Sequence, residues 1–155
     1  DIIVARALHV IGVVAWIGGV AFVTTVLLPA VRELKEPRER VQFFEAPERK
    51  FAWQARVTTL IVGLSGLYIT HTWDLWGRFE SAAYWWMHAM VIVWILFTVM
   101  LFVAEPLFLH RWFLTKAEAN PERTFRLIER MHWFLLGIST LTIFGAVAGS
   151  HGASF

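Results

Sequence analysis

The stretch ALHVIGVVAWIGGVAFVTTVLLPAV, residues 7–31, contains no charged side chain. A helix needs about 20 apolar residues to cross a bilayer. Three further stretches are free of charge, at residues 57–73, 81–104 and 131–155. We therefore expect an all-α protein, an integral membrane four-helix bundle. Its helices should lie at about residues 3–31, 50–72, 82–114 and 122–150.

Composition leads to the same expectation. The chain has 155 residues, of which 57% are hydrophobic and 17% are charged, whereas soluble domains carry about 25% charged residues. The charges lie almost entirely between the apolar stretches, which excludes an ordinary soluble enzyme and a nucleic-acid-binding domain. The chain has no cysteine, so disulfide frameworks and iron–sulfur clusters are excluded. We expect a single transmembrane domain over residues 1–155.

The connections between the expected helices are short. Residues 32–50 are polar and partly helical in this interpretation, with Pro37 and Pro47 as helix breakers. Residues 73–81 form a tight turn rich in tryptophan. The pair Asn120-Pro121 predicts the start of the fourth helix. Because proline removes a helix hydrogen bond, Glu105-Pro106 predicts a kink in the third helix.

The distribution of Lys and Arg predicts the orientation in the membrane. Twelve of the 14 lie in residues 32–56 and 111–130, and only Arg6 and Arg78 lie on the opposite face. The face with twelve should be cytoplasmic. We expect a multi-pass protein of the bacterial inner (cytoplasmic) membrane, embedded in the lipid bilayer, with both termini periplasmic.

The six histidines are the most informative residues for function, because ionisable groups within membrane spans are costly. His9 and His88 each lie about two turns into a helix from the outer face, so their depths match. Two imidazoles at equal depth on different helices suit the ligation of a haem iron from both sides. A haem also requires small residues beside its ligands, and Gly12, Trp16, Gly63 and Gly66 lie on the corresponding stripes.

Alternatives remain open for the other histidines as metal ligands. His71 and His151 lie at the outer ends of their helices, where they either form a second site or are interfacial polar groups. On the cytoplasmic side, His110 and His132 are the other pair for a second haem. Small-residue stripes also serve close helix packing, and a single buried histidine can form a hydrogen bond between helices.

A few other polar residues lie close to the spans. Glu105 lies about one helical turn from His110, where it could relay protons, accept an imidazole hydrogen bond, or pair with an arginine. Gln54 and Arg56, with Glu129 and Arg130, either line a quinone or haem-propionate pocket or anchor the helices at the interface.

The sequence resembles the HemJ and CopD-like membrane proteins. The resemblance rests on Ala7-Leu8-His9-Val10-Ile11-Gly12-Val13-Val14-Ala15-Trp16-Ile17-Gly18-Gly19 and Tyr84-Trp85-Trp86-Met87-His88, with looser similarity at Glu48-Arg49-Lys50-Phe51 and Leu127-Ile128-Glu129. It implies that His9 and His88 contact a porphyrin and that the protein binds haem b. Met90 stands where HemJ proteins usually have lysine, which favours an electron-transfer relative over a porphyrinogen oxidase.

The function that we expect is that of a membrane b-type cytochrome with one or two haem b groups. It would transfer electrons between the quinone pool and a redox partner at the outer face, as a subunit of a larger complex with other membrane or periplasmic redox subunits. Such a chain is more an electron-transfer subunit than a stand-alone enzyme, and no catalytic residue is assigned. The alternatives are a HemJ-like protoporphyrinogen IX oxidase and a CopD-like copper transport protein.

Overall fold

The computed structural model describes residues 1–152, apart from the side chain of His110. Helices make up 93% of these described residues, and no strand occurs among them. The expected all-α class is therefore confirmed. Three helical stretches are long and apolar enough to cross a membrane: Ile2–Leu34, Ala82–Leu109 and Pro121–Ser150. The protein thus has the character of a membrane protein.

The first helical stretch begins with α1 (Ile2–Phe22). It continues through a π-helical turn, η1 (Val23–Leu27), into α2 (Leu28–Leu34). The Asp1 side chain caps the helix by accepting a hydrogen bond from the Ile3 amide at 3.0 Å, which satisfies one of the free N–H groups of the first turn. Lys35 is extended and ends the helix.

Helix α3 spans Pro37–Thr72 without interruption. Pro37 opens it, at a position where the missing N–H costs nothing. The expected break at Pro47 is wrong, because this residue lies inside the helix. Tertiary packing holds the helix together around it, since Val41 and Phe44 are buried in a cluster with Phe125 of α6.

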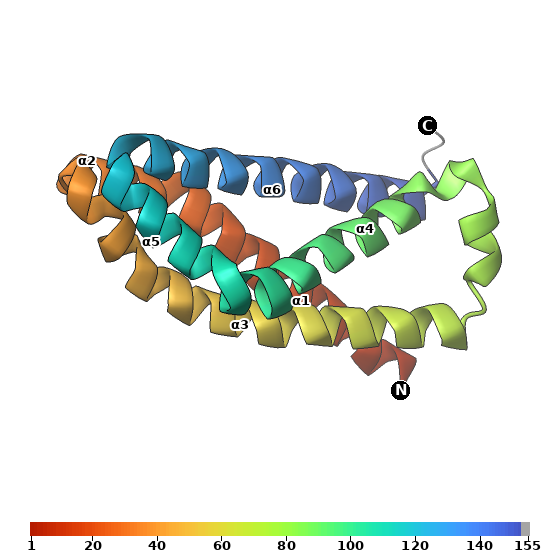
Figure 1. Ribbon diagram of the computed structural model, residues 1–155. Coiled ribbons are helices and arrows are strands. Elements are labelled where there is room, and N and C mark those ends of the chain that lie inside the picture. The colour runs from red at the N-terminus through yellow and green to blue at the C-terminus, as the bar shows by residue number, and fades with distance from the viewer. Residues whose placement is uncertain (153–155) are drawn as a thin grey trace.

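Residues 73–84 connect α3 to the next long helix through two short 3₁₀ turns, η2 (Trp76–Glu80) and η3 (Ala82–Tyr84). Helix α4 (Trp85–Val99) then widens into a ten-residue π-helix, η4 (Met100–Leu109), which precedes α5 (His110–Ala119). Pro106 lies inside η4, and α4 and α5 run in different directions (Figure 1). The kink predicted at Glu105-Pro106 is therefore confirmed.

Helix α6 (Pro121–Ser150) begins where Asn120-Pro121 predicts. The Asn120 side chain caps it by accepting a hydrogen bond from the Arg123 amide at 3.0 Å. In Figure 1, α3 lies along one side of the molecule and α6 along the other. Helix α1 runs obliquely from the N-terminus near the end of α3 to α2, and α4 crosses between α6 and α3. Trp16 of α1 packs edge-on against Phe97 of α4, with ring centroids 4.9 Å apart.

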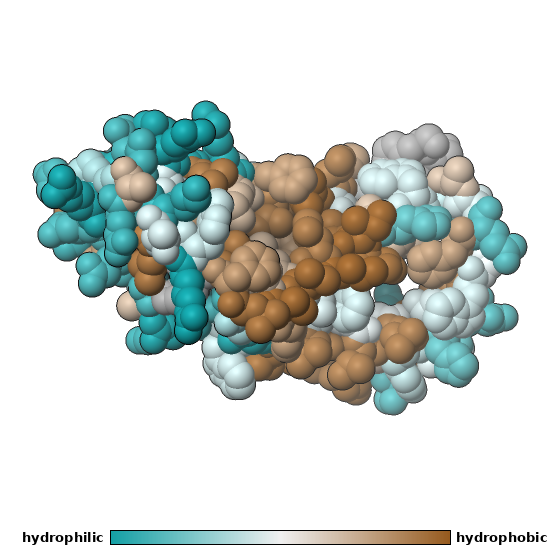
Figure 2. Space-filling view, in the orientation of Figure 1, coloured by the Kyte–Doolittle hydropathy of each residue, from teal (hydrophilic) through white to brown (hydrophobic). Residues whose placement is uncertain are grey.

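The surface is divided by polarity along the long axis of the molecule. Charged residues cover the end formed by α2, α5 and the starts of α3 and α6, and an apolar band follows (Figure 2). Val14 of α1, Ile92 of α4 and Phe144 of α6 are examples of exposed large apolar side chains on the membrane-length helices. An exposed apolar surface of this extent is typical of contact with lipid.

Candidate functional site

Four of the six histidines lie at one end of the molecule. Figure 1 places the N-terminus, the end of α3, the start of α4 and the end of α6 at the end opposite to α2. These helix ends carry His9, His71, His88 and His151. The topology therefore brings the predicted outer histidines to one side of the protein.

His9 is held against α3 by its ring nitrogen Nδ1. This atom lies 3.1 Å from the Val62 carbonyl oxygen and 3.1 Å from the Ser65 hydroxyl. A carbonyl oxygen can only accept a hydrogen bond, so Nδ1 carries the proton and donates. In the neutral ring, Nε2 then keeps its lone pair. A backbone hydrogen bond of this kind commonly orients histidines that ligate metals.

The other three outer histidines are exposed. The ring of His88 packs edge-on against Phe79, with centroids 5.3 Å apart. Nδ1 of His151 lies 2.7 Å from the Val147 carbonyl oxygen. Among the described residues, no group of three or more His, Asp or Glu side chains is arranged to hold a metal ion. The side chain of His110 lies outside the described part.

The glycines expected to leave room for a haem are in close contact with other side chains. A Cβ added at Gly12 would lie 2.8 Å from Val62, one at Gly63 would lie 2.6 Å from the Trp94 ring, and one at Gly66 would lie 3.1 Å from the His9 ring. These small residues let the helices approach closely. In this structure the glycine stripes therefore serve helix packing and the seating of His9.

Two polar groups in the same region are buried without a hydrogen-bond partner. They are the indole N–H of Trp16 on α1 and the hydroxyl of Thr59 on α3, and the residues are 3% and 0% exposed. Buried polar groups are nearly always hydrogen-bonded to protein, water or a ligand. Two such groups on the helix pair that holds His9 are unusual.

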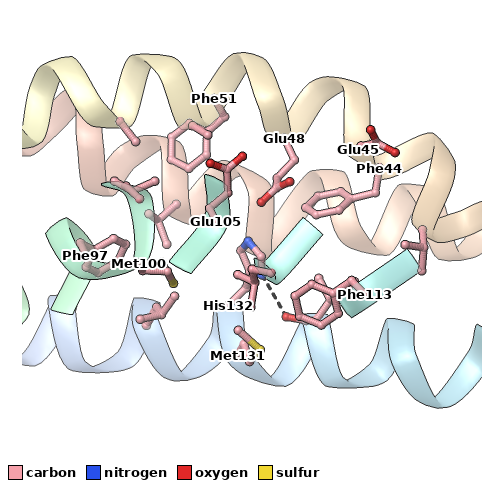
Figure 3. A pocket seen from close by; sticks show the side chains of 18 of the residues that line it. Phe44, Glu45, Glu48, Phe51, Phe97, Met100, Glu105, Phe113, Met131 and His132 are labelled. Carbon is pink, nitrogen blue, oxygen red and sulfur yellow. Dashed lines mark hydrogen bonds between the residues drawn. The ribbon is translucent and has the colours of Figure 1, made fainter. Parts of the chain in front are cut away.

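A second candidate site is a cavity of about 90 Å³ between α3, η4 and α6. Most of its wall is apolar and includes Phe44, Phe51 and Phe97. Four titratable side chains interrupt this wall, and they are Glu45, Glu48, Glu105 and His132. Figure 3 shows the imidazole of His132 pointing from α6 toward the carboxylates of Glu48 and Glu105.

His132 is oriented by its own helix and by an aromatic neighbour. Nδ1 lies 2.9 Å from the Ile128 carbonyl oxygen, so this nitrogen donates and Nε2 keeps its lone pair. The Phe44 ring packs edge-on against the imidazole, with centroids 5.7 Å apart. The ring is thus held with its basic nitrogen free for a partner in the cavity.

Glu105 is bound by Arg56 of α3. The Arg56 guanidinium forms an ion pair with the Glu105 carboxylate and also donates to the Leu101 carbonyl oxygen at 2.9 Å. The two side chains are 24% and 22% exposed, so water screens the pair only in part. The pair ties the π-helix η4 to α3 beside the cavity.

Glu48 lies on the charged side of α3, before the uncharged stretch of that helix. The pKa of Glu48 is raised to about 7, chiefly by burial and also by the negative charges of Glu105 and Glu45, against the opposing effect of Arg56 and Arg49. The carboxyl group therefore exchanges its proton near neutral pH.

No role for Glu48 was predicted from the sequence. The spacing could have indicated one, because Glu48 lies on the same face of α3 as Phe44, Phe51, Ala52 and Ala55, which point toward other helices. Such a face is normally buried. A carboxylate on it is a candidate for a shifted pKa.

The pocket predicted from Gln54, Arg56, Glu129 and Arg130 is not assembled in the way that was expected. Gln54 donates to the Ala15 carbonyl oxygen at 3.3 Å, and Glu129 pairs with Arg32 at 3.4 Å. Arg56 turns toward Glu105 instead. These contacts favour the alternative in which Gln54 and Glu129 link helices near the interface.

Comparisons with protein-family models, curated proteins and solved structures found no match for this chain. The resemblance to the HemJ and CopD-like proteins therefore stays a prediction from the quoted motifs.

Proposed function

We propose that this chain is a membrane b-type cytochrome that carries electrons between the quinone pool and a redox partner at the outer face. In this proposal the uncharged half of α3, at residues 57–73, is a fourth span beside the three apolar helices. The protein is then a four-helix bundle of a bacterial inner membrane, with both termini periplasmic and the charged end in the cytoplasm.

The observation that carries the proposal is the position of His9. Its Nδ1 proton is bound by the Val62 carbonyl oxygen, which leaves Nε2 available as a ligand. Imidazole nitrogen is the usual axial ligand of a b-type haem, and the backbone hydrogen bond on the other nitrogen increases its basicity. His9 therefore fits the group.

Two further features support a haem at this end of the bundle. His88 lies at the start of α4 with its ring exposed, so it is accessible as a second ligand. The unpaired indole N–H of Trp16 and hydroxyl of Thr59 supply donors for an acceptor on a bound group. The side chains of Val62 and Trp94 lie close to Gly12 and Gly63. A haem beside these two glycines therefore requires Val62 and Trp94 to move.

A bound haem supplies one-electron redox chemistry through its iron. The residues of this chain bind, orient and insulate it. His9 and His88 would supply the nitrogen ligands. Ser65 and the Val62 carbonyl oxygen fix the ring of His9. The apolar side chains around them exclude water, which sets the dielectric environment on which the potential depends.

The test is the haem content of single histidine variants. We expect His9→Ala and His88→Ala each to lose most of the bound haem, with loss of the reducible visible absorption band. His71→Ala is the matched control, because His71 is also an exposed histidine at this end of the molecule but lies outside the proposed pair, and it should keep the haem that His9 and His88 bind. Full haem content in both His9→Ala and His88→Ala would refute the ligand assignment.

The same preparation distinguishes the alternative functions. Haem that is reduced by quinol, without turnover of protoporphyrinogen IX, supports the electron carrier. Porphyrinogen turnover would instead assign the chain to the HemJ type of oxidase. A colourless protein that binds copper would favour the copper-transport alternative.

A further inference from the structure

The volume of the cavity between α3, η4 and α6 can be compared with that of a water molecule. Its volume is about 90 Å³. A water molecule takes about 30 Å³ in the liquid, whereas a cavity that binds a benzene ring measures about 150 Å³. The cavity therefore has room for a few water molecules.

Polar groups are present for such waters. Glu48 approaches from α3, Glu105 from η4 and His132 from α6, and their polar ends converge in Figure 3. A buried water makes about three hydrogen bonds. Apart from Glu45, the remaining lining side chains are apolar or aromatic, so waters in the cavity can bind to these carboxyl groups, to His132 and to one another.

The three side chains have complementary roles in hydrogen bonding. Nε2 of the neutral His132 ring can only accept, because Nδ1 donates to Ile128. The Glu105 side chain forms an ion pair with Arg56. Glu48 has no such cation bonded to it in the described part of the structure, and in its protonated form it is the donor among the three.

The cavity lies at the boundary between the charged end and the apolar band. Glu45 belongs to the same wall and forms an ion pair with Arg49, whose side chain is 71% exposed. The wall therefore extends from exposed charges on α3 to His132 within the span of α6. This arrangement connects the charged face of the protein with a base inside the membrane-spanning part.

We propose that this cavity is a hydrated proton-transfer site, in which Glu48 takes up a proton from the charged face and passes it to His132. In the transfer, the O–H bond of the Glu48 carboxyl group breaks and an N–H bond forms with the lone pair of Nε2 of His132. Glu48 becomes a carboxylate and His132 becomes an imidazolium, with water between them. The site does not depend on a bound haem.

The charges around Glu48 set the pH at which it titrates. On α3 these are Glu45, Arg49 and Arg56, η4 contributes Glu105, and His132 faces the cavity from α6. Of the described side chains of α5, the apolar Phe113 and Leu114 line this cavity. With a pKa of about 7, Glu48 is available both to donate and to accept a proton at neutral pH.

The experiment is a pH titration of the protein in lipid nanodiscs, followed by the infrared C=O band of protonated carboxyl groups. We expect one such band to disappear as the pH rises through about 7. Glu48→Gln should remove it. Glu39→Gln, an exposed glutamate on the same helix, should leave it unchanged. A band that persists in Glu48→Gln, or that titrates only in the ordinary range of glutamate, would overturn the proposal.

Variants of the neighbours test the coupling in the cavity. Glu105→Gln should lower the midpoint of the band, because it removes a negative charge and frees Arg56 to face Glu48. Arg56→Gln should raise it. His132→Gln should shift it as well, since the proton acceptor is lost. Unchanged midpoints in all three would show that Glu48 does not exchange protons with this cavity.

Folding of each variant is checked by its helical circular dichroism. If Glu48→Gln does not fold, Glu48→Asp provides the same test. It should keep a titrating band with a shifted midpoint, and an unshifted band would assign the signal to another carboxyl group.

Discussion

At the scale of single residues, the direction of a hydrogen bond decides what a histidine can do. His9 and His132 both use Nδ1 to bind a backbone carbonyl oxygen, and both therefore keep Nε2 free. The sequence indicated that these histidines are unusual in an apolar chain. It could not indicate the partner of His9, because Val62 lies 53 positions away along the chain.

The residues of the cavity between α3, η4 and α6 could likewise be predicted only in part from the sequence. Glu105 and His132 drew attention as ionisable groups near membrane spans, whereas Glu48 did not, because it lies among other charges of residues 32–50. Only the packing of α3 against η4 and α6 shows that its carboxyl group faces the other two.

The raised pKa of Glu48 should make the stability of the fold depend on pH. Its pKa rises from 4.5 to about 7 on folding, so between these values the folded state holds more protons than the unfolded state. Stability should therefore fall as the pH rises through this range. The Gln side chain of Glu48→Gln cannot ionise. In detergent, the thermal midpoint of this variant minus that of the wild type should therefore increase as the pH rises. An equal pH dependence in the two proteins would contradict the raised pKa.

At the scale of elements, the apolar stretches predicted the helices well. The starts of α1, α4 and α6 and the kink at Pro106 follow from local sequence. Pro47 did not break α3, because the buried neighbours Val41 and Phe44 supply packing that outweighs one missing hydrogen bond. A single sequence gives no measure of such tertiary contacts.

The glycines make a prediction about helix packing. Gly63 faces the Trp94 ring, which is fixed by its hydrogen bond to the Thr59 carbonyl oxygen at 2.9 Å. Gly63→Ala should destabilise the fold by about 1–3 kcal/mol, because a methyl group there overpacks the interface. Gly137→Ala is the control, since nothing lies within 4 Å of its added Cβ. Equal thermal midpoints for the two variants would show that α3 and α4 do not pack this closely.

At the scale of the whole molecule, the surface is divided into a charged end and an apolar band (Figure 2). The sequence predicted this division from the positions of Lys and Arg. The sequence also placed four histidines towards one end of the molecule. It could not show that no three of the described His, Asp or Glu side chains form a metal group there. That depends on how four helix ends are turned relative to one another.

Topology is testable because the chain has no cysteine. Gly77→Cys places a thiol in η2, where nothing lies within 4 Å of the added Cβ, and Glu33→Cys places one on the exposed surface of α2. A membrane-impermeant maleimide should label Gly77→Cys in intact cells and Glu33→Cys only after lysis. Labelling of Glu33→Cys in intact cells would reverse the proposed orientation.

The most direct measurement is the visible absorption spectrum of the purified full chain, before and after reduction, with haem quantified per chain. The proposed function predicts the reduced bands of haem b at a ratio of about one haem per chain, or two if a second site is filled. A folded, helical protein that stays colourless when it is produced with ample haem would contradict it.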